Sequence, residues 1–210
     1  FDLAFFGNLI FDNPLGKSNT QITVIPYTSG IKTNDFNSNI NYNNISFGGD
    51  AKVTIGNGMN LDLTFNPDFS QVEVDDQIIN ITRFEINLPE KRQFFIQNSD
   101  LFSSFGDGRD SRTFFSRRIG VARDENGNTI ENKISAGLRL SGKITKNTRL
   151  GVLNMYTNED LKNNIKANTN SVIALQQKLF SRSNLSFLFI NRQNTNKNEL
   201  DYNRVIGVDY

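Results

Sequence analysis

Four carboxylates lie within nine positions near the middle of the sequence, at Asp68, Glu73, Asp75 and Asp76. Further charged residues follow them, and these are Arg83, Glu85, Glu90, Lys91, Arg92, Arg117 and Arg118. Acids and bases gathered in this way indicate one of two arrangements. They form either a charged constriction that selects passing solutes or a network of salt bridges that braces a polar interior.

Two more specific chemistries remain open for the same residues. The four clustered acids offer hard oxygen ligands of the kind that Ca²⁺ binds, although their spacing does not match an EF-hand loop. Glu90 paired with Glu85 or Asp68 has the residue types of a glycoside hydrolase, which needs two carboxyl groups beside the scissile bond. Nothing in the sequence fixes the separation of these acids, and acids among basic neighbours more commonly form ion pairs.

The absence of two residue types narrows the catalytic options. The sequence has no His and no Cys, which removes the commonest general base and leaves neither a disulfide nor a thiolate metal site. A Ser-His-Asp or Cys-His catalyst is therefore excluded within this chain. The 23 basic and 22 acidic residues give a formal charge of +1. This balance argues against nucleic acid as a partner, because binding many phosphates requires a net basic surface.

Alternation of apolar and polar residues with a period of two predicts the elements that position this site. Gln21–Ile25 is expected to form a short strand, and the polar, Asn-rich residues 32–46 are expected to form a loop. Ala51–Ile55 and Leu61–Phe65 alternate on either side of Gly56-Asn57-Gly58, which is a strong turn signal. Together they predict a hairpin with one apolar face and one polar face.

The last third of the sequence shows this alternation most clearly. Strands are predicted at 133–144, 149–156, 171–180, 184–192 and 200–210. The apolar residues expected on one side of these strands include Ile134, Ala136, Leu138, Leu140, Leu185, Phe187 and Phe189. Each strand has roughly 9–12 residues, the length that a tilted strand needs to cross a bilayer. Short turns alternate with longer polar loops between them, as in transmembrane barrels.

These features predict an all-β fold, namely an antiparallel transmembrane β-barrel. The chain would supply a partial, N-terminal portion of it, with an inward-folded or periplasmic segment. A mean hydropathy of -0.45 is compatible with this fold, because only alternate residues face lipid. A soluble β-sandwich is the alternative, although its strands are usually shorter. The charge cluster is then expected mainly to brace the interior wall, since barrel interiors are polar.

The expected organisation has three parts. Residues 1–46 form leading strands and a polar loop, residues 47–132 form β-hairpins and a charged plug or lumen segment, and residues 133–210 form regular transmembrane hairpins. The chain has no leader at Phe1 and stops within a predicted strand at Tyr210. We therefore expect it to be a piece of a longer polypeptide whose following part supplies the remaining strands.

The central region also carries a series of distinctive motifs in a fixed order. They are Asn66-Pro67-Asp68-Phe69-Ser70-Gln71-Val72-Glu73, Pro89-Glu90-Lys91-Arg92-Gln93-Phe94-Phe95, Ser116-Arg117-Arg118-Ile119-Gly120 and the stretch RLSGKITKNTRLGVLN at 139–154. This series resembles a family of large outer-membrane β-barrel proteins of Gram-negative bacteria, and the resemblance extends from about Gly48 onward. Members of that family have an N-terminal domain like the family-nine carbohydrate-binding modules, followed by a C-terminal barrel of undefined function.

The resemblance implies a non-enzymatic protein of the outer membrane of a Gram-negative bacterium, acting as a pore, a transport or export component, or a scaffold in an envelope complex. It implies outer-membrane lipid as the surroundings, other envelope proteins as partners, and no cofactor apart from the Ca²⁺ considered above. The carbohydrate-binding domain lies outside these residues. Glycan binding and uptake through that domain is therefore an alternative for the whole protein, and a carboxylate-based glycoside hydrolase is a second alternative. The family offers no catalytic residues to transfer.

Overall fold

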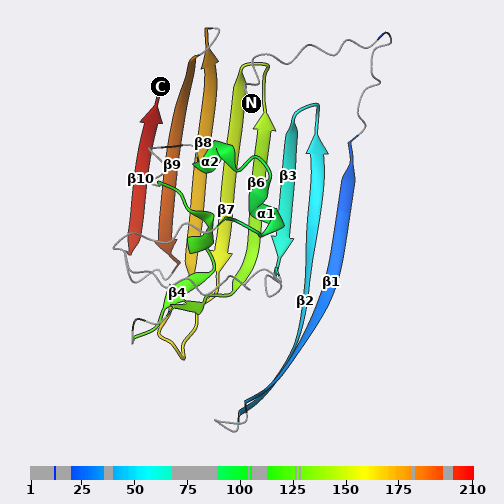
Figure 1. Cartoon of the computed structure of the whole chain (residues 1–210), viewed down its shortest axis with the longest axis vertical. Coiled ribbons are helices and arrows are strands. Elements are labelled where there is room, and N and C mark those ends of the chain that lie inside the picture. The colour runs from blue at the N-terminus through cyan, green and yellow to red at the C-terminus, as the bar shows by residue number, and fades with distance from the viewer. Residues whose placement is uncertain are drawn as a thin grey trace.

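One antiparallel sheet of eight strands dominates the computed structural model, which describes residues 12, 20–35, 40–67, 89–103, 105, 113–125, 127, 129–180, 183–195 and 201–210. The strand order is β1-β2-β3-β6-β7-β8-β9-β10 (Figure 1). The strands are β1 (Ile22–Asp35), β2 (Ile40–Ile55), β3 (Met59–Phe65), β6 (Ile134–Lys143), β7 (Thr148–Thr157), β8 (Asn168–Leu179), β9 (Ser183–Asn194) and β10 (Tyr202–Asp209). The predicted all-β, antiparallel fold is confirmed. The described strands form an open sheet with β1 and β10 as its edges, and not a closed barrel.

The period-two pattern gives the sheet one mainly apolar side, which we call the apolar face, although Asn154, Asn191 and Arg204 on β7, β9 and β10 also lie on it. At its centre Leu63 on β3 lies between Ala51 on β2 and Leu138 on β6. Large exposed side chains on this face are Ile22, Val24, Ile45, Phe47, Ile55, Leu63, Phe65, Leu138, Tyr156, Ile173, Leu175, Leu185, Phe187, Tyr202, Ile206 and Val208. No element that the structure describes covers this face.

The opposite side, which we call the helix-bearing face, is partly covered by the connection between β3 and β6. This connection contains α1 (Gln93–Ile96), α2 (Asp100–Ser103), η3 (Ser116–Arg118), β4 (Val121–Arg123) and β5 (Thr129–Glu131). In Figure 1 the helices α1 and α2 lie in front of the middle strands of the sheet. No helix in the described part of the chain is long and apolar enough to cross a membrane.

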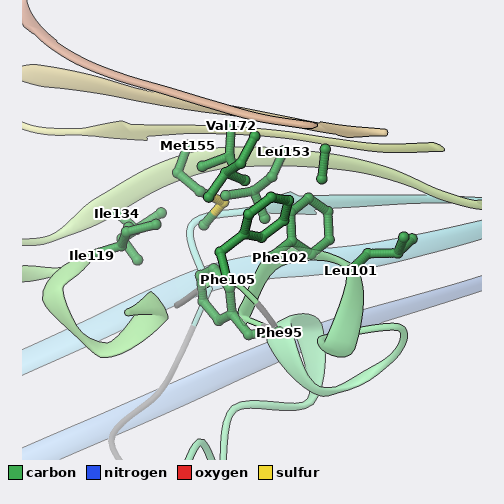
Figure 2. Close-up of a cluster of buried hydrophobic side chains, with 11 residues drawn as sticks. Phe95, Leu101, Phe102, Phe105, Ile119, Ile134, Leu153, Met155 and Val172 are labelled. Carbon is green, nitrogen blue, oxygen red and sulfur yellow. The ribbon is translucent and has the colours of Figure 1, made fainter. Parts of the chain in front are cut away.

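A hydrophobic core fills the space between the helices and the sheet (Figure 2). Its members are Phe95, Leu101, Phe102, Phe105, Ile119, Ile134, Leu153, Met155, Val172, Ala174 and Leu188. Burial of a large apolar side chain stabilises a fold by about 1.5–3 kcal/mol. The core therefore holds the helices firmly against the strands.

A glycine in the sheet lets α2 approach closely. A Cβ atom at Gly151 on β7 would lie 2.6 Å from the ring of Phe102, which is closer than real carbon atoms pack. On the neighbouring strand the small residue Ala174 lies opposite Gly151 and belongs to the same core. Gly151 therefore marks the place where the sheet receives Phe102.

One sequence prediction about the first hairpin was wrong. Residues 32–46 were expected to form a loop, but most of them belong to β1 and β2, which pair continuously from Ile22–Val53 to Asp35–Ile40. Only 36–39 lies between the two strands. Asn-rich sequence lacks the apolar alternation that predicts a strand, yet backbone pairing extends the ladder through it.

A β-bulge corrects a second prediction. Ile134 was expected to share a face with Leu138 and Leu140, but the register between β6 and β7 shifts between Ile134 and Ala136. The extra residue turns Ile134 to the helix-bearing face, where it is 4% exposed and contributes to the core. The other predicted strands of the last third are confirmed, with small differences at their ends.

Connections of different lengths gather at the two ends of the sheet. Those at one end are 56–58, 144–147 and 180–182. Those at the other end are 36–39, 66–133, 158–167 and 195–201. Short turns at one end and longer connections at the other were predicted, and every connection agrees with this except 36–39, which is as short as the turns at the opposite end.

Candidate functional site: a segment docked on the polar side of the sheet

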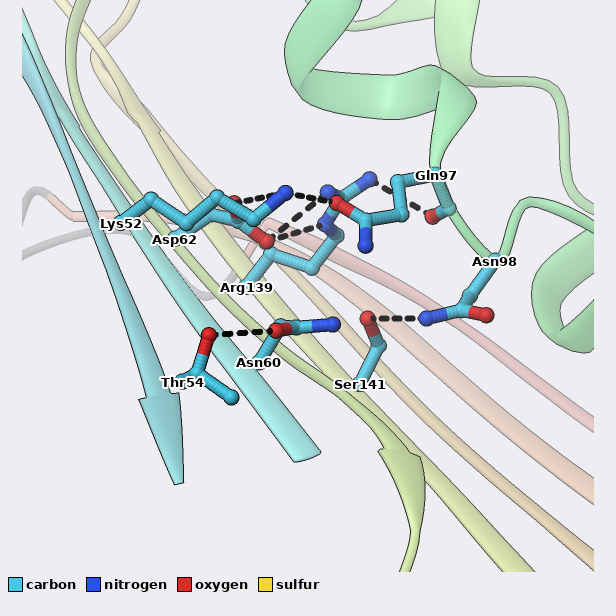
Figure 3. A network of polar contacts seen from close by, with 8 residues as sticks. All are labelled: Lys52, Thr54, Asn60, Asp62, Gln97, Asn98, Arg139 and Ser141. Atoms are coloured by element: carbon cyan, nitrogen blue, oxygen red, sulfur yellow. Dashed lines mark hydrogen bonds and ion pairs between the residues drawn. The ribbon is translucent and has the colours of Figure 1, made fainter. Parts of the chain in front are cut away.

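A buried ion pair connects two strands to the segment above them. Arg139 on β6 and Asp62 on β3 are cross-strand partners, and Arg139 donates from Nε and Nη2 to Asp62 Oδ2 at 3.2 and 2.8 Å. Nη1 of Arg139 donates to the carbonyl oxygen of Gln97 at 2.8 Å (Figure 3). The guanidinium lies 5.3 Å from the centre of the Phe94 ring. Arg139 is only 1% exposed, and such burial is tolerated because these partners satisfy its charge and its donors.

A second cation extends this network toward the open part of the sheet. Lys52 on β2 lies opposite Asp62, with its Nζ 3.8 Å from Asp62 Oδ1, and it also donates to Oε1 of Gln97. Next to it, Asn98 donates to the hydroxyl of Ser141 at 3.1 Å (Figure 3). The side chain of Lys52 remains 43% exposed. Three neighbouring strands thus present one polar patch that receives Gln97 and Asn98, just after α1.

Glu90 and Arg92 form a clamp inside the docked segment, by which we mean residues 89–103 and 113–120. Arg92 donates from Nε to Oε1 of Glu90 at 2.9 Å and from Nη2 to Oε2 at 2.8 Å. It also donates to the carbonyl oxygens of Ser116 and Ile119, each at 2.7 Å. The Ser116 hydroxyl completes the ring by donating to Glu90 Oε2 at 2.5 Å. The clamp therefore ties residues 89–92 to residues 116–119, two motifs that are distant in sequence.

The electrostatics of Glu90 suit an ion pair better than proton transfer. Burial raises the pKa of Glu90, but the hydrogen bonds and charge of Arg92, with the Ser116 hydroxyl, outweigh this effect and hold the pKa below its ordinary value. A carboxylate that is ionised at neutral pH can only accept hydrogen bonds. The general acid of a glycoside hydrolase requires the opposite shift.

A third charged contact holds α2 on the other side of the segment. Arg149 on β7 donates to Asp100 from Nη1 at 2.6 Å and from Nη2 at 3.1 Å. The hydrogen bond from Arg149 lowers the pKa of Asp100, against a smaller opposing effect of burial. The side chain of Asp100 is 56% exposed, so this pair contributes at most about 1 kcal/mol. It positions α2 more than it stabilises it.

A cavity of about 350 Å³ lies between the docked segment and the sheet. Its lining combines the aromatic residues Phe95, Phe102, Phe114 and Phe115 with the polar residues Glu90, Arg139, Ser99, Ser103 and Ser116. Phe95 is fully buried in the core, and Phe114 packs against it. Phe95 and Phe114 therefore belong to the interior packing between the segment and the sheet. Glu90 is the one acid among the described residues that line the cavity, so the cavity holds no pair of acids.

The structure brings together only part of the predicted charge cluster. Glu90 and Arg92 meet in the clamp, whereas the backbone carbonyl groups of the 116–119 turn, and not the side chains of Arg117 and Arg118, complete it. Lys91 and Arg118 are exposed at the surface of the segment. The remaining members, Asp68, Glu73, Asp75, Asp76, Arg83 and Glu85, lie outside the described residues, and so does the predicted Ca²⁺ site. Among the residues that are described, no group of acids could hold a metal ion.

Sequence reasoning missed the ion pair that holds the segment in place. Lys52, Asp62 and Arg139 stand at alternating positions of three predicted strands, and each was counted simply as a residue of the polar side. The signal was their opposite charge on strands that become neighbours. Pairing β3 directly with β6 across a long connection brings Asp62 opposite Arg139, and this pairing is not visible in the sequence.

Comparison with known families adds one finding to this geometry. The family model for the Domain of unknown function (DUF5916) matches residues 18–209. The chain belongs to this family. The DUF5916 match spans the complete eight-stranded sheet and the docked segment, so both are parts of one family domain. No curated protein and no solved structure matches the chain.

Membership of DUF5916 confirms the resemblance only in part. It establishes a family whose function is undefined. The outer-membrane location and the neighbouring carbohydrate-binding domain stay predictions.

Proposed function

We propose that this chain forms part of the wall of a transmembrane β-barrel in the outer membrane of a Gram-negative bacterium. In this proposal the barrel is a non-enzymatic pore, and the docked segment partly fills its lumen. The apolar face carries the argument, because large apolar side chains are exposed on every one of the eight strands. A bare apolar area of this size is unfavourable in water, whereas lipid requires it.

The length of the apolar face supports a lipid bilayer as its surroundings. On β2 the outward residues from Ile45 to Ile55 are apolar or glycine, and they span about 33 Å at a rise of about 3.3 Å per residue. A strand tilt of about 40° reduces this length to about 25 Å along the membrane normal, which is the height of the apolar band in outer-membrane barrels. Leu63, opposite Ala51, then lies close to the middle of the band.

The distribution of charge supports the same arrangement. A soluble two-layer protein would cover its more apolar side and leave its charged side in water. Here the covering segment lies on the side that carries Lys52, Asp62 and Arg139, and the more apolar side, where Arg204 on the edge strand β10 is a charged residue, is bare. Polar residues inside and apolar residues outside are typical of a barrel wall in lipid.

In a membrane, the two edge strands of the sheet need partners for their backbone hydrogen bonds. Lipid offers no hydrogen bonds to the free backbone groups of β1 and β10, so a sheet in a bilayer must close. Both edges must therefore pair with further strands in the assembled protein.

The test uses the full-length protein in its native host. We expect it to fractionate with the outer membrane, to require detergent for extraction, and to migrate faster in an unheated gel than after boiling. We also expect the purified protein to conduct ions in a planar bilayer. Recovery of folded protein in the soluble fraction without detergent would refute the membrane location, and a folded membrane protein without conductance would refute the pore.

A further inference from the structure

Among the residues that the structure describes, none of the docked segment covers the helix-bearing face of β1, and one part of that face is bare. The docked segment packs on β6 to β8 through a core in which Leu153, Met155 and Val172 are at most 1% exposed. None of the helices that the structure describes lies over β1 or β2 (Figure 1). Within the described part of the connection, the segment reaches β2 where Gln97 accepts a hydrogen bond from Lys52. The boundary between the covered and uncovered parts therefore runs along Lys52.

The uncovered part is mainly polar and includes both signs of charge. On β1 and β2 the helix-bearing positions that are fully or partly exposed include the polar residues Thr23, Ser29, Ser46, Asp50, Lys52 and Thr54, together with Ile25 and Tyr27. Hydroxyl groups of Ser29 and Ser46 lie 3.5 Å apart across the two strands. Asp50 and Lys52 follow each other on one face, so neither charge dominates locally. Such a surface offers hydrogen bonds to small polar solutes and does not select strongly for cations or anions.

The docked segment is fixed to the covered part of the face by several contacts, so solutes cannot pass beneath it. Arg139, 1% exposed, bonds the backbone of Gln97, Phe102 fits against Gly151, and Arg149 holds Asp100. Opening a route beneath the segment would expose these groups together. A route beside the segment breaks none of these contacts.

We infer that small hydrophilic solutes pass along the helix-bearing face of β1 and β2, beside a docked segment that stays in place. This inference rests on the proposed pore. It adds the position of the passage, the class of solute, and the absence of strong charge selection.

The chain contains no cysteine, so single cysteines can report on each surface of the full-length protein. Ser46→Cys probes the passage, and Phe47→Cys, next to it on β2 and 69% exposed on the apolar face, is the matched control. Ala174→Cys, 1% exposed beneath the segment, is the control for the covered region. Each variant is reconstituted in a planar bilayer and treated with a charged, water-soluble thiol reagent and with a lipid-soluble maleimide.

We expect the charged reagent to react with the Ser46→Cys variant and to lower its single-channel conductance in steps that a reducing agent reverses. The Phe47→Cys variant should react only with the lipid-soluble maleimide, and the Ala174→Cys variant with neither.

If Phe47→Cys reacts rapidly with the charged reagent, the apolar face lies in water and the proposed membrane wall is wrong. If Phe47→Cys is shielded but modification of Ser46→Cys leaves the conductance unchanged, the wall stands and the passage along β2 is wrong. A rapid reaction of Ala174→Cys would refute the fixed segment.

Discussion

Replacement of Leu63 by arginine separates a lipid-facing wall from a soluble sheet by the size of its effect. The side chain of Leu63 is 38% exposed at the centre of the apolar face, between Ala51 and Leu138. At the middle of a bilayer an outward arginine destabilises a barrel by about 2–4 kcal/mol. In water a substitution at such a partly exposed site changes stability by about 0.5 kcal/mol when no special contact is lost. The two surroundings therefore predict clearly different results.

The assay measures the free energy of unfolding of the full-length protein in lipid vesicles by denaturant titration. Leu161→Arg is the matched control, because it makes the same change at a residue that is 82% exposed in the 158–167 connection. Leu63→Ala accounts for the lost packing. We expect Leu63→Arg to be less stable than Leu161→Arg by about 2–4 kcal/mol. Equal stability of the two arginine variants within about 0.5 kcal/mol would refute the lipid-facing wall.

Three further predictions concern the docked segment. Arg139→Leu should destabilise the protein by about 3–5 kcal/mol in denaturant titration, because it leaves Asp62 charged and buried, and the added Asp62→Leu should restore much of the loss; no restoration would contradict the role of the pair. Gly151→Val should cost about 1–3 kcal/mol, since its side chain meets Phe102, and Phe102→Ala should relieve part of that cost. The pKa of Glu90 is lower in the folded protein than in the unfolded chain, so ionised Glu90 stabilises the clamp at pH values above the unfolded pKa of about 4.3. This stabilisation is lost as the pH falls through the lower pKa of the folded protein. The protection factors of the segment's amides against hydrogen exchange should therefore fall below about pH 4.3, and Glu90→Gln should lower these protection factors at neutral pH and flatten their acid dependence; an unchanged pH profile would contradict the clamp.

The strands of the last third were predictable because alternation and turn residues agree there. Leu185 and Phe187 alternate with polar residues and lie on one face, as predicted. The strands of the first hairpin were not predictable near its turn, because residues 32–46 include polar residues on both faces of the sheet. In such a strand the pairing partner determines the structure, and single-sequence patterns carry no information about it.

The candidate site was predictable for local contacts and not for contacts across the sheet. Glu90 and Arg92 are two positions apart, and their pairing follows from opposite charge at short range. The pair between Asp62 and Arg139 spans 77 positions. It depends on the register of β3 against β6, which a connection of this length leaves undetermined in the sequence.

The direct pairing of β3 with β6 has a consequence for how the domain can evolve. The 68 residues from 66 to 133 stand where a tight turn would serve, and Asn66 and Ser135 still close the ladder by a backbone hydrogen bond of 2.6 Å. Chain-closure entropy grows only with the logarithm of length, so such an insertion costs about 2.5 kcal/mol more than a four-residue turn. The sheet is thus a frame that tolerates a large, exchangeable insert at one hairpin. Relatives with a different insert can keep the same strands and acquire a different cover on the helix-bearing face.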